Sequence, residues 1–198
     1  MNESAQTSPN IPSPADSYSP DQHDAALNSG LPQLAIGEMI ALCSAKLLIH
    51  IFTSLRHYGY FRDELYYLDM ARHLDWGYVD AAPLVAVYAR IALLMGGSLA
   101  ALRIIPALAG VALIALTMLV ARELGGGRYA EFLAGLCVLL CPAVLVMDNF
   151  LSMNAFEPLI WMGCIWVVAR ILRTGDSRLW IWFGVLAGLG LEIGRAHV

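Results

Sequence analysis

Five carboxylates lie within one polar interval of an otherwise apolar chain. The interval covers residues 58–84 and reads YGYFRDELYYLDMARHLDWGYVDAAPL. Its acidic residues, out of sixteen Asp and Glu in the whole chain, are Asp63, Glu64, Asp69, Asp75 and Asp80. A carboxylate can take a proton from a reacting hydroxyl, and a cluster of carboxylates close to a membrane is costly unless it has a function. We therefore regard this interval as the candidate site.

The adjacent pair Asp63 and Glu64 also has a structural explanation. Apolar residues recur at the spacing of one helical face, and polar residues fall on the opposite face. The apolar set is Tyr67, Met70, Ala71 and Leu74, and the polar set is Asp69, Arg72 and His73. This pattern predicts an amphipathic helix along the membrane surface, beginning near Asp63. Two carboxylates in its first turn would stabilise the helix dipole by about 0.3–1 kcal/mol, and spacing alone favours this explanation.

Composition identifies the chain as an integral membrane protein. Of its 198 residues 59% are hydrophobic and only 14% are charged, with a mean hydropathy of +0.63, whereas a soluble domain has about 25% charged residues. The net charge is −4, and the twelve Lys and Arg form no basic stripe, which argues against nucleic-acid binding. The four cysteines lie in apolar runs, so we expect buried thiols rather than a metal site or a disulfide framework.

The hydropathy pattern predicts an all-α polytopic fold with about five spans. The apolar runs are 34–53, 99–121, 132–146, 158–171 and 179–191. A further run, 84–95, is too short to span and would be re-entrant or interfacial. Residues 1–33 contain no Lys or Arg and many Ser and Pro, so we expect a disordered tail before a membrane domain at 34–191.

Arginines predict which side of the membrane each connection faces. The connections after the second and fourth spans carry Arg122, Arg128, Arg170, Arg173 and Arg178. By the positive-inside rule these connections are cytoplasmic. The interval 58–84 and a second polar and aromatic patch, MDNFLSMNAFE at 147–157, would then both face the outside.

Two motifs carry a resemblance to a known family. FRDELYYLDMARHLDWGYVDAAPL, followed by LSMNAFEPLIW, resembles the bacterial members of glycosyltransferase family 39, the dolichyl-phosphate-mannose-protein mannosyltransferase-like enzymes of the GT-C fold. The resemblance covers about residues 34–191. It implies a multi-pass, inverting enzyme of the bacterial inner (plasma) membrane. Such an enzyme takes a sugar from a polyprenyl-phosphate donor and transfers it to a lipid or protein acceptor at the outer face.

The resemblance also implies roles for individual residues. Asp63 would be the general base, and Glu64 would orient it, bind substrate or cap the helix. Asp80 would be a second acidic site residue. Relatives usually have Asp-His-Pro-Pro-Leu at this place, whereas this chain has Asp-Ala-Ala-Pro-Leu at 80–84, with Ala81 and Ala82 in place of the His and the first Pro.

In the second patch, Asn154 and Glu157 match the family's SMNxFE pattern and would bind substrate. Glu157 is the better functional candidate of the two, and its structural alternative is a helix-start carboxylate before Pro158. Displacement at an anomeric carbon develops oxocarbenium character while the phosphate leaves, so a cation opposite that phosphate would complete the site. Arg62 and Arg72 are the nearest cations, with a divalent metal ion as the other source of charge.

Two other classes of protein stay open from the sequence. A transporter or flippase would use ionisable residues within the spans, and Lys46, His50 and Glu157 are the candidates for such a path. A membrane scaffold, or a truncated inactive product, would need none of these roles. Because most carboxylates lie outside the spans, the pattern favours an enzyme over a transporter.

The last seven residues, EIGRAHV at 192–198, end the apolar pattern abruptly. A common sequencing adapter would encode this string when read as protein. We therefore expect 192–198 to be non-native, and 34–191 to be the N-terminal part of a domain with further spans.

Overall fold

The computed structural model describes residues 30–54, 59–78, 81 and 83–193. The chain divides into two units, 1–31 and 32–198, and the described helices all belong to the second unit. The disordered tail expected at 1–33 falls almost entirely outside the described residues, as does most of the segment 192–198.

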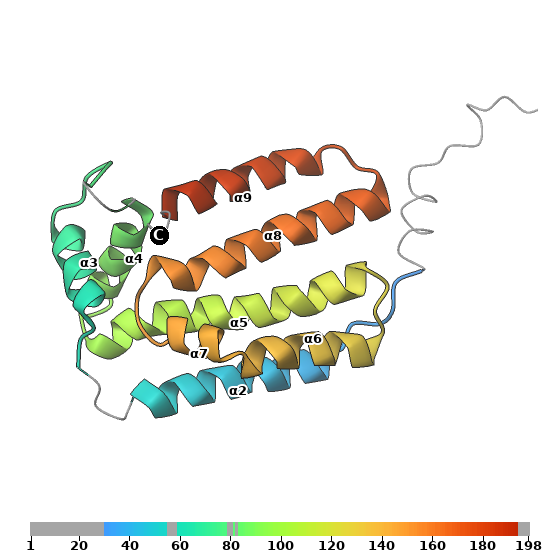
Figure 1. Cartoon of the computed structure of the whole chain (residues 1–198), viewed down its shortest axis with the longest axis horizontal. Coiled ribbons are helices and arrows are strands. Elements are labelled where there is room, and N and C mark those ends of the chain that lie inside the picture. The colour runs from blue at the N-terminus through green and yellow to red at the C-terminus, as the bar shows by residue number, and fades with distance from the viewer. Residues whose placement is uncertain (1–29, 55–58, 79–80, 82, 194–198) are drawn as a thin grey trace, which may run out of the picture. The chain divides into compact units, whose positions relative to one another are not determined.

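The described residues form helices and no strands, which confirms the all-α fold. The helices are α2 (Ile36–Ser54), α3 (Arg62–Arg72), α4 (Pro83–Leu94), α5 (Leu99–Glu123), α6 (Arg128–Leu140), α7 (Pro142–Met147), α8 (Met153–Thr174) and α9 (Leu179–Ile193) (Figure 1). Among them, α2, α5 and α8 are long and apolar enough to cross a membrane, while α4 and α9 are shorter apolar helices. The protein is therefore an integral membrane protein, and these three helices of its described part are candidate spans.

The run expected to be a span at 132–146 is divided into two helices. The first, α6, ends at Leu140, and α7 begins at Pro142 after an extended Cys141. Proline lacks a backbone N–H and clashes with the preceding turn of a helix, but it is well tolerated at the first helical position. Pro142 therefore ends one helix and starts the next.

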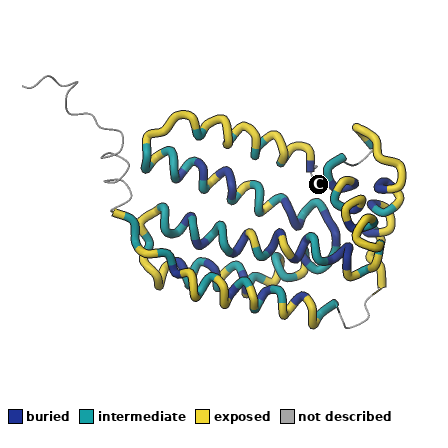
Figure 2. The backbone as a smooth tube through the Cα atoms, turned by 180° about the vertical axis from the view of Figure 1, so that it is seen from behind, coloured by how far each residue is buried: buried dark blue, intermediate teal, exposed yellow. Residues whose placement is uncertain are grey.

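Helix α5 lies at the centre of the bundle. It packs against α2, α6 and α8, and α8 in turn packs against α9. Small residues on α5, among them Ala101, Ala107, Ala109 and Gly110, are buried and allow close approach of the neighbouring helices. Figure 2 shows buried residues along α5 and mostly exposed residues along α9, whose outward apolar side chains suit contact with lipid.

The two short helices α3 and α4 lie at one end of the bundle, where α8 begins and α9 ends (Figure 1). Tyr67, Met70 and Ala71 of α3 are buried, as the amphipathic pattern predicts, whereas Leu74 lies beyond the helix and is exposed. The buried face of α3 packs against Val85, Ala86 and Ala89 of α4, so protein rather than lipid covers it.

Ion pairs and a helix cap hold the opposite end of the bundle. Glu131 Oε2 accepts the backbone N–H of Ala35 at 2.9 Å, just before α2 begins. Glu38 pairs with Arg128, and Glu123 at the end of α5 pairs with Arg173 of α8. The arginine-rich connections therefore lie at the end of the bundle away from the two polar patches, and the side of the membrane that each end faces stays a prediction.

Gly135 marks the closest packing of α6. A Cβ atom at this position would lie 2.8 Å from Leu42 Cδ1 and 2.9 Å from Met118 Cγ, which come from α2 and α5. We expect Gly135→Val to lower the free energy of unfolding by about 1–3 kcal/mol, because overpacking a buried contact displaces its neighbours. The control is Gly184→Val on α9, where a Cβ would meet nothing within 4 Å. Thermal unfolding in detergent measures both, and equal midpoints would contradict the packing.

Candidate functional site

The buried carboxylate of Glu64 joins three parts of the protein. Its Oε1 accepts hydrogen bonds from Arg103 Nε at 3.3 Å and from the backbone N–H of Leu151 at 3.2 Å. Its Oε2 accepts the backbone N–H of Phe61 at 2.8 Å and Arg103 Nη2 at 3.3 Å. Glu64 is fully buried and Arg103 is nearly so. One side chain therefore connects the start of α3, helix α5 and the segment that precedes α8.

Local sequence explains how Glu64 reaches these partners. Phe61 is the N-cap residue of α3, and an acidic side chain three residues later can turn back to the free N–H of the N-cap residue. Arg103 also donates to the backbone carbonyl of Gly59 at 2.7 Å, so it fixes the chain on both sides of the helix start. In the sequence, Arg103 is visible as a charge near the start of an apolar run, but its partner is not.

Asp63, the neighbour of Glu64, lies in a different environment. Its side chain is 37% exposed, and its Oδ1 lies 3.4 Å from Nε of Arg62, which is 92% exposed. An exposed ion pair of this kind contributes at most about 1 kcal/mol to stability. Of the two adjacent carboxylates, Glu64 is enclosed by donors, and Asp63 is partly open to solvent.

The structure also places the other residues predicted on α3 and in the following loop. Arg62 and Arg72 are exposed at the two ends of α3, about 15 Å apart along the axis at 1.5 Å per residue. Only Arg62 lies beside Asp63. Asp80 lies outside the described residues. Among those described, no three His, Cys, Asp or Glu side chains come together as a metal site requires.

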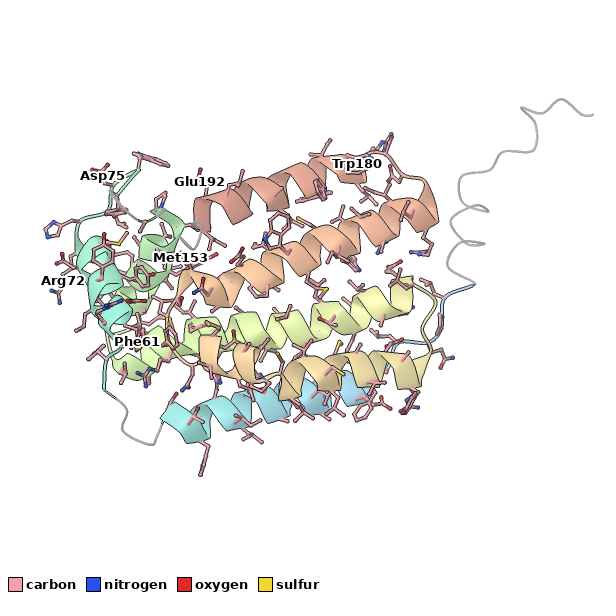
Figure 3. All side chains as sticks on the ribbon, in the orientation of Figure 1. Phe61, Arg72, Asp75, Met153, Trp180 and Glu192 are labelled. Atoms are coloured by element: carbon pink, nitrogen blue, oxygen red, sulfur yellow. The ribbon has the colours of Figure 1, made fainter. Side chains whose placement is uncertain are left out.

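The second polar patch lies beside the first. The Phe150 and Phe61 rings are 4.5 Å apart, and Leu151 donates to Glu64. Asn154 and Glu157 follow in the first turns of α8, both partly buried. Figure 3 shows Phe61, Arg72 and Met153 gathered at this end of the bundle. The prediction that 58–84 and 147–157 share one face of the protein agrees with this arrangement.

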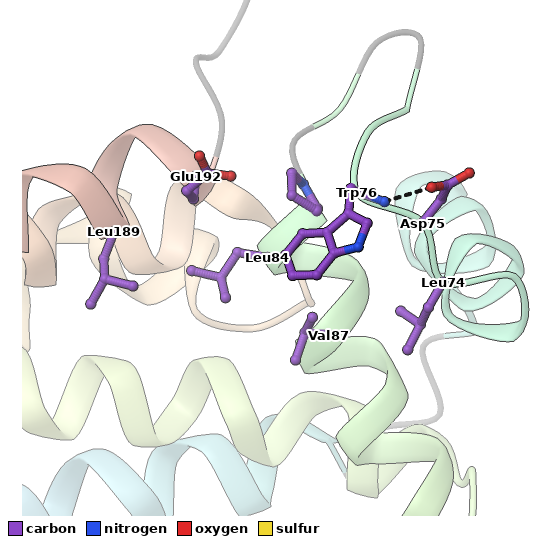
Figure 4. A pocket seen from close by; sticks show the side chains of 8 residues that line it. Leu74, Asp75, Trp76, Leu84, Val87, Leu189 and Glu192 are labelled. Carbon is purple, nitrogen blue, oxygen red and sulfur yellow. Dashed lines mark hydrogen bonds between the residues drawn. The ribbon is translucent and has the colours of Figure 1, made fainter.

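A pocket of about 600 Å³ opens at the same end of the bundle. Its lining residues are Leu74, Asp75, Trp76, Pro83, Leu84, Val87, Leu189 and Glu192 (Figure 4). Asp75 Oδ1 accepts the backbone N–H of Trp76 at 2.7 Å, and the Trp76 side chain is almost fully exposed. The lining is mostly apolar, and Asp75 and Glu192 are its two acidic residues.

Lys46 and His50, the residues considered for a transport path, are both buried on α2. Lys46 Nζ lies 2.8 Å from Asp148 Oδ2, and His50 Nε2 contacts the Asp148 carbonyl. Two pockets lie beside His50, and neither includes Lys46 or Glu157 in its lining. Lys46 and His50 are therefore engaged in contacts between α2 and the end of α7.

Comparison with known proteins gives one family. Residues 80–193 match the family described as dolichyl-phosphate-mannose-protein mannosyltransferase. No curated protein and no solved structure matches the chain. The match covers the second polar patch and most of the bundle, and it begins after Asp63 and Glu64.

Removing Arg103 tests the role of the Glu64 contacts in stability. We expect Arg103→Met to lower the free energy of unfolding by about 3–5 kcal/mol, because it leaves a buried carboxylate without its cation. Arg62→Met is the matched control and should change stability by less than about 1 kcal/mol, because Arg62 is exposed. Thermal unfolding in detergent separates the two, and equal small effects would show that Glu64 does not depend on Arg103.

Proposed function

Because the chain belongs to the dolichyl-phosphate-mannose-protein mannosyltransferase family, we propose that it transfers a sugar from a polyprenyl-phosphate donor to a lipid or protein acceptor, with Asp63 as general base. Membership makes it a membrane-embedded glycosyltransferase of the mannosyltransferase type. The donor, the acceptor, the outer face of the bacterial plasma membrane and the roles of single residues are parts of the proposal.

The contrast between Asp63 and Glu64 is the observation that carries the assignment. A general base must come within hydrogen-bond distance of the hydroxyl whose proton it takes. The Asp63 side chain is 37% exposed and can meet such a hydroxyl, whereas Glu64 is enclosed by Arg103 and two backbone N–H groups. Of the three roles considered for Glu64, these contacts support orienting Asp63 and capping α3 over binding substrate.

The proposed reaction is a displacement at the anomeric carbon. The acceptor oxygen forms the new bond to that carbon, the bond from carbon to the phosphate oxygen breaks, and polyprenyl phosphate leaves with the electron pair. Asp63 takes the proton of the acceptor hydroxyl. The polyprenyl phosphate is already a competent leaving group, so positive character at the sugar and removal of this proton are what the protein must stabilise.

Polar and charged residues of the two patches would bind the substrates. Arg62 is the described cation beside Asp63 and would face the leaving phosphate. Asn154 and Glu157 at the start of α8 would contact sugar or acceptor hydroxyls, because the second patch is held against α3 through Leu151. Asp80 and Arg72 remain substrate-binding proposals, Asp80 as an acidic residue and Arg72 as a second cation.

Replacing the base tests the mechanism directly. We expect Asp63→Asn to lower kcat for transfer from a polyprenyl-phosphate sugar by at least about 100-fold, the low end of general-base effects. The assay uses membranes from cells that express the protein. Asp69→Asn, on the exposed side of the same helix, should keep the wild-type kcat. If Asp63→Asn retained that kcat at normal expression, Asp63 would not be the base.

Labelling of introduced cysteines tests the proposed orientation. Trp76 lies at the end of the bundle that carries α3, and Leu124 lies in the turn after α5 at the other end; both are well exposed. In a chain whose Cys43, Cys137, Cys141 and Cys164 are replaced by Ala, we expect a membrane-impermeant maleimide to label Trp76→Cys in intact cells. Leu124→Cys should react only after the membrane is opened. The reverse pattern would place the site on the cytoplasmic side.

A further inference from the structure

A second buried charged pair lies between α2 and the end of α7. Lys46 Nζ and Asp148 Oδ2 are 2.8 Å apart, and the two side chains are 0% and 3% exposed. One turn further along α2, His50 Nε2 contacts the carbonyl oxygen of Asp148. Another turn along, Thr53 Oγ1 donates to Asn149 Oδ1 at 3.1 Å. One face of α2 therefore holds Asp148 and Asn149 through three side chains.

Helix α5 also packs closely against this pair, at Gly110. A Cβ atom on Gly110 would lie 2.1 Å from Asp148 Oδ2 and 2.7 Å from Lys46 Cε. Any other residue at position 110 would therefore occupy the place of the carboxylate or the ammonium stem. Gly110 lies seven residues after Arg103 on α5, so both residues lie on the same face of that helix, about 10 Å apart.

The energetics of the pair need an explanation beyond stability. Removing two charges from water costs several kcal/mol for each ion, and an apolar pair of similar shape is often as stable or more stable. A buried ion pair, unlike an apolar pair, favours one separation of its two charged groups. This property is useful where a segment must be held in one position.

The segment held by Lys46 leads directly to the acidic pair. Three residues after Asp148, the Leu151 N–H donates to Glu64 Oε1, and the intervening Phe150 packs against Phe61, the N-cap residue of α3. Asp63 lies in the sequence between Phe61 and Glu64, the two residues that make these contacts. A displacement of Asp148 would therefore reach the first turn of α3 through residues 149–151.

We propose that Lys46 and Asp148 are positioning residues for the transfer reaction. The pair fixes the segment 148–151, and this segment holds the first turn of α3 so that Asp63 meets the acceptor hydroxyl. The proposal rests on the proposed function for its effect on turnover, and on the structure alone for the coupling between the two segments.

The decisive variant removes both charges together. Lys46→Met combined with Asp148→Leu keeps the approximate shapes, and we expect a thermal midpoint close to that of the wild type. We expect kcat to fall by about 10- to 100-fold, because small misplacements of a reacting group have effects of this size. KM for the polyprenyl-phosphate sugar should stay within about twofold. Hydrogen exchange, measured by mass spectrometry, should become faster in peptides that cover 148–152 and 59–65.

If the pair does not position the first turn of α3, kcat and hydrogen exchange should not change. The double variant would then have the wild-type midpoint, kcat and exchange, and this outcome would overturn the proposal. If the double variant does not fold, Gly110→Ala decides, because its methyl group displaces the carboxylate without removing a charge, with Gly184→Ala as control. Wild-type kcat and exchange in Gly110→Ala would also overturn the proposal.

Hydrogen exchange distinguishes failure of this proposal from failure of the proposed function. If the wild-type protein transfers no sugar, the proposed function fails, and faster exchange of 59–65 in the double variant still supports coupling of the two segments. If transfer is present and the double variant leaves kcat and exchange unchanged, only the positioning proposal fails.

Discussion

The enclosed carboxylate of Glu64 is the contact on which the arrangement of the site depends. A buried charge is tolerated only where a cation and hydrogen-bond donors replace water, and here they come from Arg103, Phe61 and Leu151. These donors belong to α5, to the start of α3 and to the segment before α8. The requirement to satisfy one side chain therefore fixes three distant parts of the chain against one another.

Helix α5 connects this carboxylate to the rest of the bundle. Arg103 and Gly110 lie two turns apart on one face of α5. Arg103 supplies the cation for Glu64, and Gly110, which has no side chain, leaves space for the Asp148 carboxylate. The Lys46–Asp148 pair packs against Gly110. The segment from Asp148 to Leu151 ends at the hydrogen bond from the Leu151 N–H to Glu64. The two buried charged groups are thus connected through α5 and through this segment, rather than being independent features of the bundle.

The sequence predicts the helices well and their polar partners poorly. Hydropathy identifies the three long apolar helices α2, α5 and α8, and the 3.6-residue period places Tyr67, Met70 and Ala71 on the buried face of α3. Glu64 lies three residues before Tyr67, so the same period also places it on the buried face. The sequence could not predict the partners of the buried charges. Arg103 lies 39 positions after Glu64, and Asp148 lies 102 positions after Lys46, so only the packing of helices brings each pair together.

Helix geometry explains why adjacent carboxylates can have opposite roles. Successive residues are separated by about 100° around a helix axis, so when Glu64 points into the bundle, Asp63 points to the side of the helix, where it is 37% exposed. Anchoring the buried member then orients the exposed member without any direct contact between them. The same carboxylate that caps α3 also sets the rotation of the helix about its axis, and the capping and the functional explanations of this acidic pair are therefore compatible. A first turn that only needed a favourable charge near the helix dipole would not require Glu64 to be enclosed by Arg103.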